Sequence, residues 1–199
     1  MDERTVPIPG ARSVEGTLEA PAGARNLVVE CPPHPQYGGN RYDSRITAVS
    51  DSLTALGVAT LRFDYGPWDE GLGEREDVRN AIRWGAERYE RVGLFGYSFG
   101  GTMAVLAAGS VDVDLCAVSL LAPALQVVEG IDAEARLSAI EAPIQVIYGT
   151  RDETAHWESL VEAAEALGAT VLSVSGDHFF VGQMDGIAAD VGEFLATHC

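Results

Sequence analysis

Short runs of apolar residues recur along the chain and predict buried β-strands. The runs are rich in Val, Ile and Leu and lie at residues 27–30, 58–63, 92–95, 116–121, 144–148 and 170–174. Because successive positions are apolar, and not only alternate ones, both faces of these strands are expected to be covered.

Helical patterns separate these runs. Apolar residues spaced three and four apart occur over residues 46–56, 78–89, 157–167 and 187–194. Gly57 and Gly168 follow two of these segments, where glycine commonly ends a helix. Strands that alternate with helices predict a mostly parallel sheet with helices on both faces. Two more polar segments, 5–9 and 14–20, predict a leading antiparallel hairpin.

Length and composition favour one domain. The chain has 199 residues, of which 47% are hydrophobic, and no repeat or linker divides it. At about 150 residues per domain this predicts a single domain over residues 1–199. The first residues lack the apolar run of a secretory signal, and the longest apolar stretch, 115–125, is broken by Ser119 and Pro123. No membrane span is therefore expected, and the protein is predicted to be cytoplasmic.

The three cysteines are expected to be reduced thiols. Cys31, Cys116 and Cys199 are far apart, odd in number and without the spacing of metal ligands. Neither a metal nor an organic cofactor is expected.

The chain is strongly acidic, with 30 acidic and 13 basic side chains and a formal net charge of −17. Such a field repels phosphate groups, so neither nucleic acid nor an anionic membrane is expected as a partner. Many acids fall on predicted helices and are expected to face solvent: Glu74, Glu76, Asp77, Glu87, Glu90, Glu158, Glu162 and Glu165. All bases are arginine, which pairs well with carboxylates. A halophilic origin is favoured, and an ordinary acidic, arginine-rich protein is the alternative.

The chemistry of such a sheet is expected in the loops that follow the carboxyl ends of its strands. These loops are 31–39, 64–71, 96–101, the segment from Pro123 onward, 149–152 and 176–178. Three of them offer a serine, an acid and a histidine.

The serine lies in a G-x-S-x-G pattern, Gly96-Tyr97-Ser98-Phe99-Gly100. The pattern directly follows a predicted strand and leads into a helical segment at 102–108, which is the context of a nucleophile elbow. Such a turn exposes the serine Oγ above the sheet, and the flanking glycines let strand and helix approach closely. The alternative is a glycine-rich turn with an idle serine.

A serine nucleophile requires a base and a group that orients the base. His178 follows the last predicted strand and Asp152 the one before it, giving the order Ser, Asp, His. His34 lies in the first crossover loop, His156 on the polar side of a predicted helix and His198 at a frayed end. Asp152 has the alternative of only capping a helix that begins near Thr154. Glu153 and Asp177 are less suitable acids.

These segments resemble small dienelactone-hydrolase-related α/β hydrolases. The resemblance rests on His34-Pro-Gln-Tyr-Gly-Gly39, Leu56-Gly-Val-Ala-Thr-Leu-Arg-Phe63, Gly96-Tyr-Ser-Phe-Gly-Gly101, Gly149-Thr-Arg-Asp152 and Gly176-Asp-His-Phe-Phe180, and extends from about residue 13 to the end. It implies an α/β-hydrolase fold of about eight strands without a lid domain. It also implies that Ser98, Asp152 and His178 form the triad and that the loop from His34 supplies an oxyanion donor.

An oxyanion requires two fixed N–H groups. The Phe99 N–H is expected to be one, and the N–H of Gln36 or Tyr37 the other, since Pro35 has none. The alternative is a Pro/Gly turn without a donor role. The chain departs from the family pattern at Pro32, where a second histidine is common, and in the loop 64–71. Tyr65 and Trp68 of that loop are expected to wall the substrate pocket or to act as packing plugs, and Tyr97 to contact substrate.

The sequence therefore predicts a serine hydrolase, a carboxylesterase or a dienelactone-hydrolase-like enzyme. It would cleave a small ester, lactone or thioester through an acyl-enzyme on Ser98. Its expected partner is a small-molecule ester, and it is expected to be a monomer or a homodimer. The alternative function is that of a non-catalytic ligand-binding protein on a hydrolase scaffold.

Overall fold

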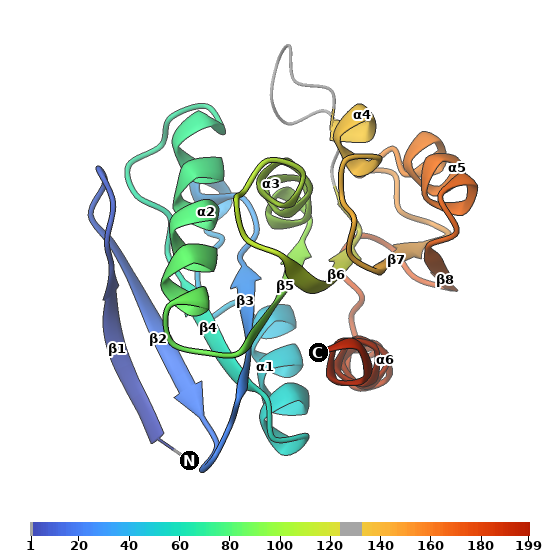
Figure 1. Ribbon diagram of the computed structural model, residues 1–199. Helices are drawn as coiled ribbons and strands as arrows, with labels where there is room; N and C mark the ends of the chain where they lie inside the picture. Colours follow the sequence, from blue (N-terminus) through green and yellow to red (C-terminus); the bar gives the residue numbers. More distant parts are fainter. Residues whose placement is uncertain (1, 124–132) are drawn as a thin grey trace.

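The computed structural model describes residues 2–123 and 133–199, and its centre is an eight-stranded sheet (Figure 1). The strands are β1 (Asp2–Ile8), β2 (Val14–Ala20), β3 (Asn26–Cys31), β4 (Ala59–Phe63), β5 (Arg91–Tyr97), β6 (Leu115–Leu121), β7 (Ile144–Gly149) and β8 (Thr170–Val174). They pair in the order β1-β2-β4-β3-β5-β6-β7-β8. All pairs from β4 to β8 are parallel, whereas β1 and β2 pair antiparallel with each other and β2 pairs antiparallel with β4.

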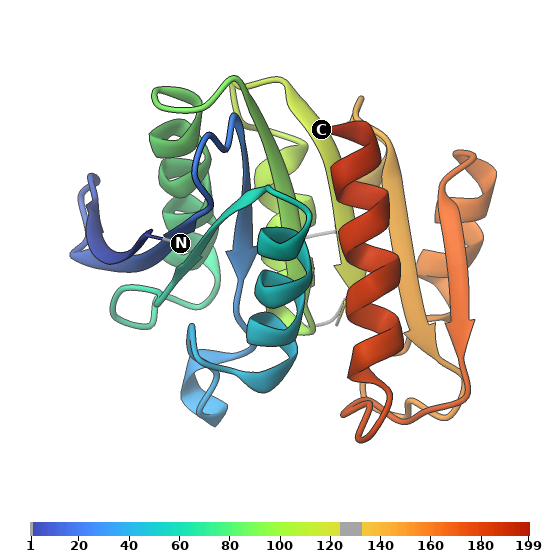
Figure 2. The ribbon, with the colours of Figure 1, turned by 90° about the horizontal axis from the view of Figure 1, so that it is seen from below.

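Helices cover both faces of this sheet (Figure 2). One face carries α1 (Ser44–Ala55) and α6 (Met184–His198), which pack against each other. The other carries α2 (Leu72–Ala86), α3 (Phe99–Ala108), α4 (Ala133–Leu137) and α5 (Glu158–Ala166). A short 3₁₀ helix, η1 (Pro35–Tyr37), lies in the loop after β3. Two hydrophobic clusters, one on each face, form the core.

The predicted elements agree with this architecture. The mostly parallel sheet, the helices on both faces and the leading hairpin are confirmed. The predicted strands differ from the observed ones by a few residues at most, and β4 is buried along its whole length. The short helices η1 and α4 were not predicted. The predicted loop from Pro123 onward lies, for residues 124–132, outside the described part of the chain.

Two of the acids that were expected to face solvent are buried, so that prediction is wrong for them. Glu74 and Asp77 on α2 have no exposed surface. Arg12, in the turn between β1 and β2, lies 3.2 Å from a carboxyl oxygen of Glu74 and 3.1 Å from one of Asp77. These two acids therefore hold the hairpin on α2. The sequence pattern of α2 could not reveal these ion pairs, because Arg12 lies more than 60 residues before Glu74 in the chain.

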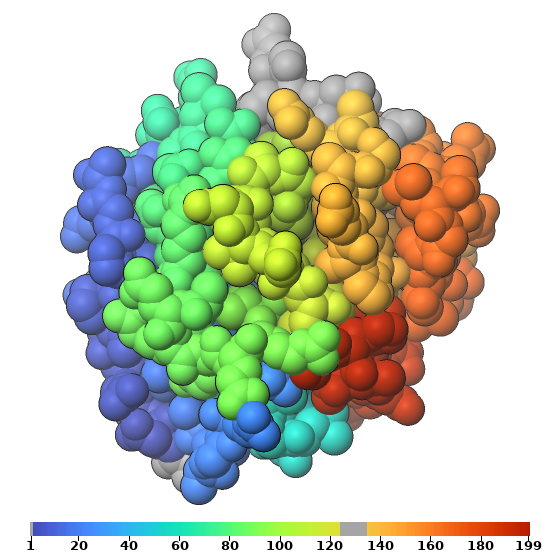
Figure 3. Space-filling model, in the orientation of Figure 1, coloured from blue at the N-terminus to red at the C-terminus, as the bar shows by residue number. Residues whose placement is uncertain are grey.

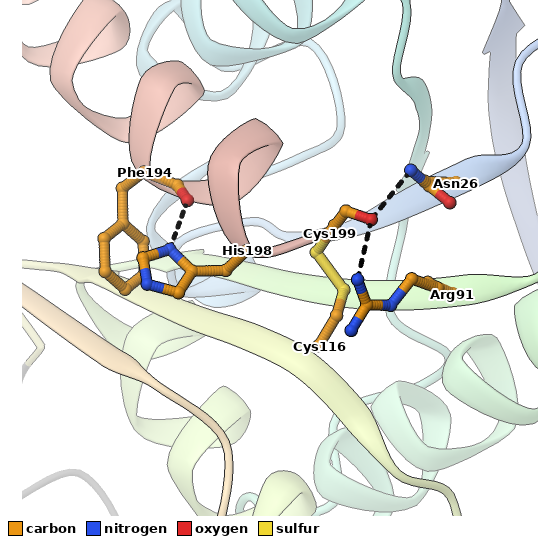
Figure 4. Close-up of a disulfide and its surroundings, with 6 residues drawn as sticks. All are labelled: Asn26, Arg91, Cys116, Phe194, His198 and Cys199. Atoms are coloured by element: carbon orange, nitrogen blue, oxygen red, sulfur yellow. Dashed lines mark hydrogen bonds between the residues drawn. A yellow bond between two sulfur atoms is a disulfide. The ribbon is translucent and has the colours of Figure 1, made fainter.

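The prediction of three reduced cysteines is also wrong. Cys116 on β6 and Cys199 after α6 form a disulfide, and Cys31 is the buried free thiol (Figure 4). The Cys199 carbonyl accepts hydrogen bonds from Asn26 and Arg91. The end of α6 is therefore held to three strands and is not frayed.

In the part of the chain that the structure describes, no helix is both long and apolar enough to cross a lipid bilayer.

Candidate active site

Ser98 stands at the turn between β5 and α3. Its backbone has φ 55° and ψ −120°, a region that residues other than glycine rarely enter. The turn is possible only because its neighbours are glycines. A Cβ on Gly96 would lie 2.4 Å from the Gly100 carbonyl oxygen, and one on Gly100 would lie 2.1 Å from that of Cys31. The local sequence thus forms the sharp strand–turn–helix connection that exposes the serine Oγ.

The structure brings the predicted serine, histidine and acid together. Ser98 Oγ lies 2.8 Å from His178 Nε2, and His178 Nδ1 lies 2.7 Å from Asp152 Oδ2. A carboxylate can only accept, so Nδ1 carries the proton and Nε2 is the acceptor facing the serine. Asp152 and His178 are each 6% exposed, which shields this pair from water. The arrangement can remove a proton from Ser98.

Asp152 uses its two carboxyl oxygens for different purposes. Oδ2 binds His178, while Oδ1 accepts hydrogen bonds from the N–H groups of Thr154 at 2.8 Å and Ala155 at 3.0 Å. The two interpretations of Asp152, as a triad acid and as a capping residue, therefore describe the same side chain. The backbone bonds fix the carboxylate in the orientation that His178 requires. They cap a turn and not α5, which begins only at Glu158.

Tyr97 fixes the backbone of His178 through a hydrogen bond. Its hydroxyl donates a hydrogen bond to the His178 carbonyl at 2.8 Å, and the side chain is 2% exposed. Burial raises the pKa of Tyr97 to about 12, so it remains a protonated donor at neutral pH. Tyr97 borders the cavity described below, where it was expected to contact substrate, but its hydroxyl is already committed to the His178 loop.

The loop after β3 passes directly over the start of α3. Both expected oxyanion donors of this loop are already engaged within it. The Gln36 N–H donates to His34 Nδ1 at 3.2 Å, and the Tyr37 N–H donates to the His34 carbonyl at 3.1 Å. Among the described residues, the His34 N–H has no acceptor, and the Phe99 N–H stands at the first position of α3, where helices leave amides unpaired.

A cavity of about 690 Å³ opens above Ser98. Its wall contains one acid and one arginine, Asp43 and Arg45, which pair with each other through two hydrogen bonds. The Arg45 guanidinium also lies 4.7 Å above the Tyr97 ring. In a chain of net charge −17, the described part of this cavity wall thus carries no unpaired acid. The volume is in the range of small-molecule sites.

His34 contributes a neutral ring to this wall. Burial lowers its pKa, and the nearby Glu74 only partly offsets that effect. Its ring packs 4.6 Å from Trp68 and 4.7 Å from Phe99. His34 is therefore held in place by the loop 64–71 and by α3.

Tyr65 and Trp68 lie behind the cavity wall and do not line it. The Tyr65 ring meets Phe63 and Phe99 edge to face, and its hydroxyl donates to the Pro32 carbonyl at 3.2 Å. Trp68 packs on His34 and Phe99. Of the two interpretations that the sequence left open, the packing plug describes both residues.

Several residues that line the cavity were not predicted as site residues, among them Asp43, Arg45, His156 and Phe179. His156 was expected on a helix, but it precedes α5 and has φ 46°. Asp43 caps α1 by accepting the Arg45 N–H, a role that an Asp before a helical pattern could have suggested. Phe179 could have been suggested by its position, because it is an aromatic residue next to His178 in a loop at the end of a strand.

Among residues 2–123 and 133–199, no group of three or more His, Cys, Asp or Glu side chains is arranged to hold a metal ion.

Comparison with known proteins places the chain among α/β hydrolases. A family model described as the dienelactone hydrolase family matches residues 65–175, more than half of the chain. An uncharacterized 31.7 kDa protein of Escherichia coli from the traX-finO intergenic region is 37% identical over 133 residues, which cover 56% of this chain and 40% of that protein. The chain thus spans about two fifths of the length of the curated relative that it matches.

Solved structures share the fold at low sequence identity. An alpha-beta serine hydrolase homologue from Coxiella burnetii has a TM-score of 0.82 and 23% identity, covering 98% of this chain and 97% of its own. A dienelactone hydrolase from Anabaena variabilis has a TM-score of 0.81 and 21% identity, covering 99% and 98%. A serine hydrolase without lid from Xanthomonas campestris has a TM-score of 0.80 and 20% identity, covering 96% and 93%.

These matches confirm the predicted fold and the predicted family. The described residues form one α/β-hydrolase sheet with its flanking helices, and no lid is inserted among them. With the family model matched over more than half of its length, the chain belongs to the dienelactone hydrolase family.

Proposed function

We propose that this chain is a serine hydrolase that cleaves a small ester, lactone or thioester through an acyl-enzyme on Ser98. The observation that carries the proposal is the chain of short contacts from Ser98 Oγ to His178 Nε2 at 2.8 Å and from His178 Nδ1 to Asp152 Oδ2 at 2.7 Å. The strained backbone of Ser98 supports it, since such strain is concentrated at functional sites.

In this mechanism His178 takes the proton of Ser98 as Oγ attacks the substrate carbonyl. Asp152 holds the histidine tautomer and stabilises the imidazolium that forms. The proton then passes from Nε2 to the leaving group as the bond between carbonyl carbon and leaving group breaks. Water, deprotonated by the same histidine, releases the acyl group from Ser98.

Two backbone N–H groups bind the oxyanion in this proposal, those of Phe99 and His34. The Phe99 amide follows the nucleophile at the start of α3, where the helix dipole also favours negative charge. His34 replaces Gln36 and Tyr37 as the second donor. Its amide has no acceptor among the described residues, whereas theirs are bonded within the loop.

The substrate that this site suits is a small neutral molecule. The one acid that the described residues contribute to the cavity wall is neutralised by Arg45, and the remaining lining is largely apolar or aromatic. A cytoplasmic location and the absence of nucleic-acid or membrane partners remain predictions from the composition.

A fluorophosphonate probe tests the proposal. We expect covalent labelling of folded wild-type protein at Ser98, no labelling of Ser98→Ala, and turnover of short acyl esters that falls by a factor of about 10³ or more in Ser98→Ala. Failure of the folded protein to label would contradict the proposal. Absence of turnover, with ligand binding unchanged in Ser98→Ala, would favour a non-catalytic binding protein.

A further inference from the structure

Large apolar side chains stand exposed beside the catalytic histidine. Phe179 is 55% exposed and lines the cavity, and Val181, two residues on, is 85% exposed. Leaving such side chains in water is unfavourable unless a partner covers them. Of the two, Phe179 lies in the wall of the cavity, where a bound substrate would cover it.

The loop that carries them is rigidly built. Phe180, between the two exposed residues, is completely buried and has φ 52°, an unfavourable conformation for a bulky residue. Tyr97 holds the His178 carbonyl, and Asp177 accepts the Phe179 N–H at 3.0 Å. The loop thus fixes the ring of Phe180 in the core and presents the ring of the preceding residue, Phe179, to the cavity.

Phe179 lies on the histidine side of the reaction centre. Its ring centre is 5.8 Å from that of His178, edge to face. The proposed oxyanion donors belong to His34 and Phe99, whose rings pack together at 4.7 Å. The carbonyl oxygen of a substrate must reach those amides, whereas its leaving group must reach His178.

Resting on the proposed function, we propose that Phe179 forms the subsite for the leaving alcohol, and that this alcohol carries an apolar, preferably aromatic, group. In the acylation step the bond from Ser98 Oγ to the carbonyl carbon forms and the bond from that carbon to the alcohol oxygen breaks. The proton on His178 Nε2 goes to the alcohol oxygen. That oxygen must therefore lie within hydrogen-bond reach of His178, and its substituent extends past Phe179.

The acyl group remains on Ser98 after the alcohol has left. A subsite beside His178 therefore affects acylation and its dependence on the alcohol. It leaves deacylation, which is common to all esters of one acid, unaffected. This separation distinguishes a leaving-group subsite from a general loss of active-site structure.

The experiment compares kcat/KM for methyl and benzyl acetate, whose alcohols are of similar acidity, and for methyl acetate and methyl butanoate, whose acyl groups differ. We expect Phe179→Ala to lose about fivefold to tenfold on benzyl acetate and less than about twofold on the two methyl esters. Phe179→Leu should recover part of the loss. Tyr42→Ala, an exposed aromatic residue outside the cavity wall, is the matched control and should change none of the values.

An equal loss on all three esters, or a loss confined to the acyl series, would overturn the subsite. Fluorophosphonate labelling is measured in parallel on wild type and Phe179→Ala. If neither is labelled at Ser98, it is the proposed function that fails. If both are labelled and benzyl acetate is not favoured, only the leaving-group subsite fails.

Discussion

Of the two backbone N–H groups proposed to bind the oxyanion, that of His34 can be removed by a single substitution. His34 has φ −58° and ψ 120°, and a proline accepts this φ without strain. His34→Pro should lower kcat by a factor of about 10²–10³ relative to His34→Ala, because both variants lose the imidazole and only the first loses the amide.

Circular dichroism spectra and melting temperatures of the two variants should agree, which would exclude unfolding as the cause. Equal activities of His34→Pro and His34→Ala would show that this amide does not bind the oxyanion.

Glu30 gives the stability of the fold a pH dependence. It lies on β3 without exposed surface, and burial raises its pKa well above the usual value, despite the opposing charge of Arg62. The folded chain therefore retains this proton in a pH range where the unfolded chain has lost it. Stability contributed by protonated Glu30 is present at low pH and is lost as pH rises through the raised pKa.

Glu30→Gln should remove this loss of stability at higher pH, because glutamine cannot ionise. We expect the variant to gain stability relative to wild type as pH rises through the raised pKa of Glu30. Urea unfolding at a series of pH values measures it, with Glu193→Gln, an exposed residue of α6, as the control. A difference between Glu30→Gln and wild type that is independent of pH would refute this assignment.

At the scale of elements, the disulfide joins the end of α6 to β6. Gly93 on β5 makes room for it, since a Cβ there would lie 2.9 Å from the sulfur of Cys199. The loop that it closes spans 83 residues, for which a chain-entropy model gives about 4.5 kcal/mol of stabilisation.

Reduction should therefore lower the melting temperature by several degrees. Wild type and the double variant Cys116→Ser/Cys199→Ser are compared by calorimetry with and without reductant. Only the wild type should respond to reductant. If reductant leaves its melting temperature unchanged, the disulfide is absent or contributes nothing.

Most elements were predictable because the strands β3 to β8 contain apolar runs and the helices α1, α2, α5 and α6 have apolar faces. The ties between distant elements were not. Arg12 reaches two acids of α2 across the hairpin, and Cys199 reaches β6 from the other end of the chain. Both contacts depend on how closely two elements approach each other in space. The periodicity of a single segment carries no information about that distance.

The same distinction explains the site. Ser98, Asp152 and His178 follow the parallel strands β5, β7 and β8, whose carboxyl ends lie at the same end of the sheet. Their order along the chain was therefore a sufficient guide. The cavity wall depends instead on α1 and on the conformation of two loops. Arg45 and Phe179 were missed for that reason. The hydrogen bonds that engage Gln36 and Tyr37 arise from η1, a single turn too short to leave a pattern.

At the scale of the whole molecule, the acidic side chains outnumber the basic ones by 17. Counting carboxylates of the described residues alone, nine of the 13 arginines lie within 4.0 Å of one, so the positive charges are mostly neutralised where they stand. What remains is a surplus of acids that repel one another. Salt should relieve this repulsion, because the Debye length falls from about 10 Å at 0.1 M to about 3 Å at 1 M.

The melting temperature should therefore rise between about 0.1 and about 1 M KCl. Glu162→Gln/Glu165→Gln, which removes two exposed acids of α5, should melt higher at low salt and gain less from KCl. A melting temperature that stays constant or falls with KCl would contradict the expectation of a salt-adapted protein.

The strand order also places the serine after a central strand of the sheet and the histidine after an edge strand. The nucleophile follows β5, which has neighbours on both sides, whereas the base follows β8, which has a neighbour on one side only and forms one flank of the molecule (Figure 3). Edge elements open locally at lower free energy than central ones. In mild denaturant, amides of β8 should exchange with solvent while those of β5 remain closed, and the serine would then be present in an intact core without its base. Loss of activity should accordingly precede loss of the fold.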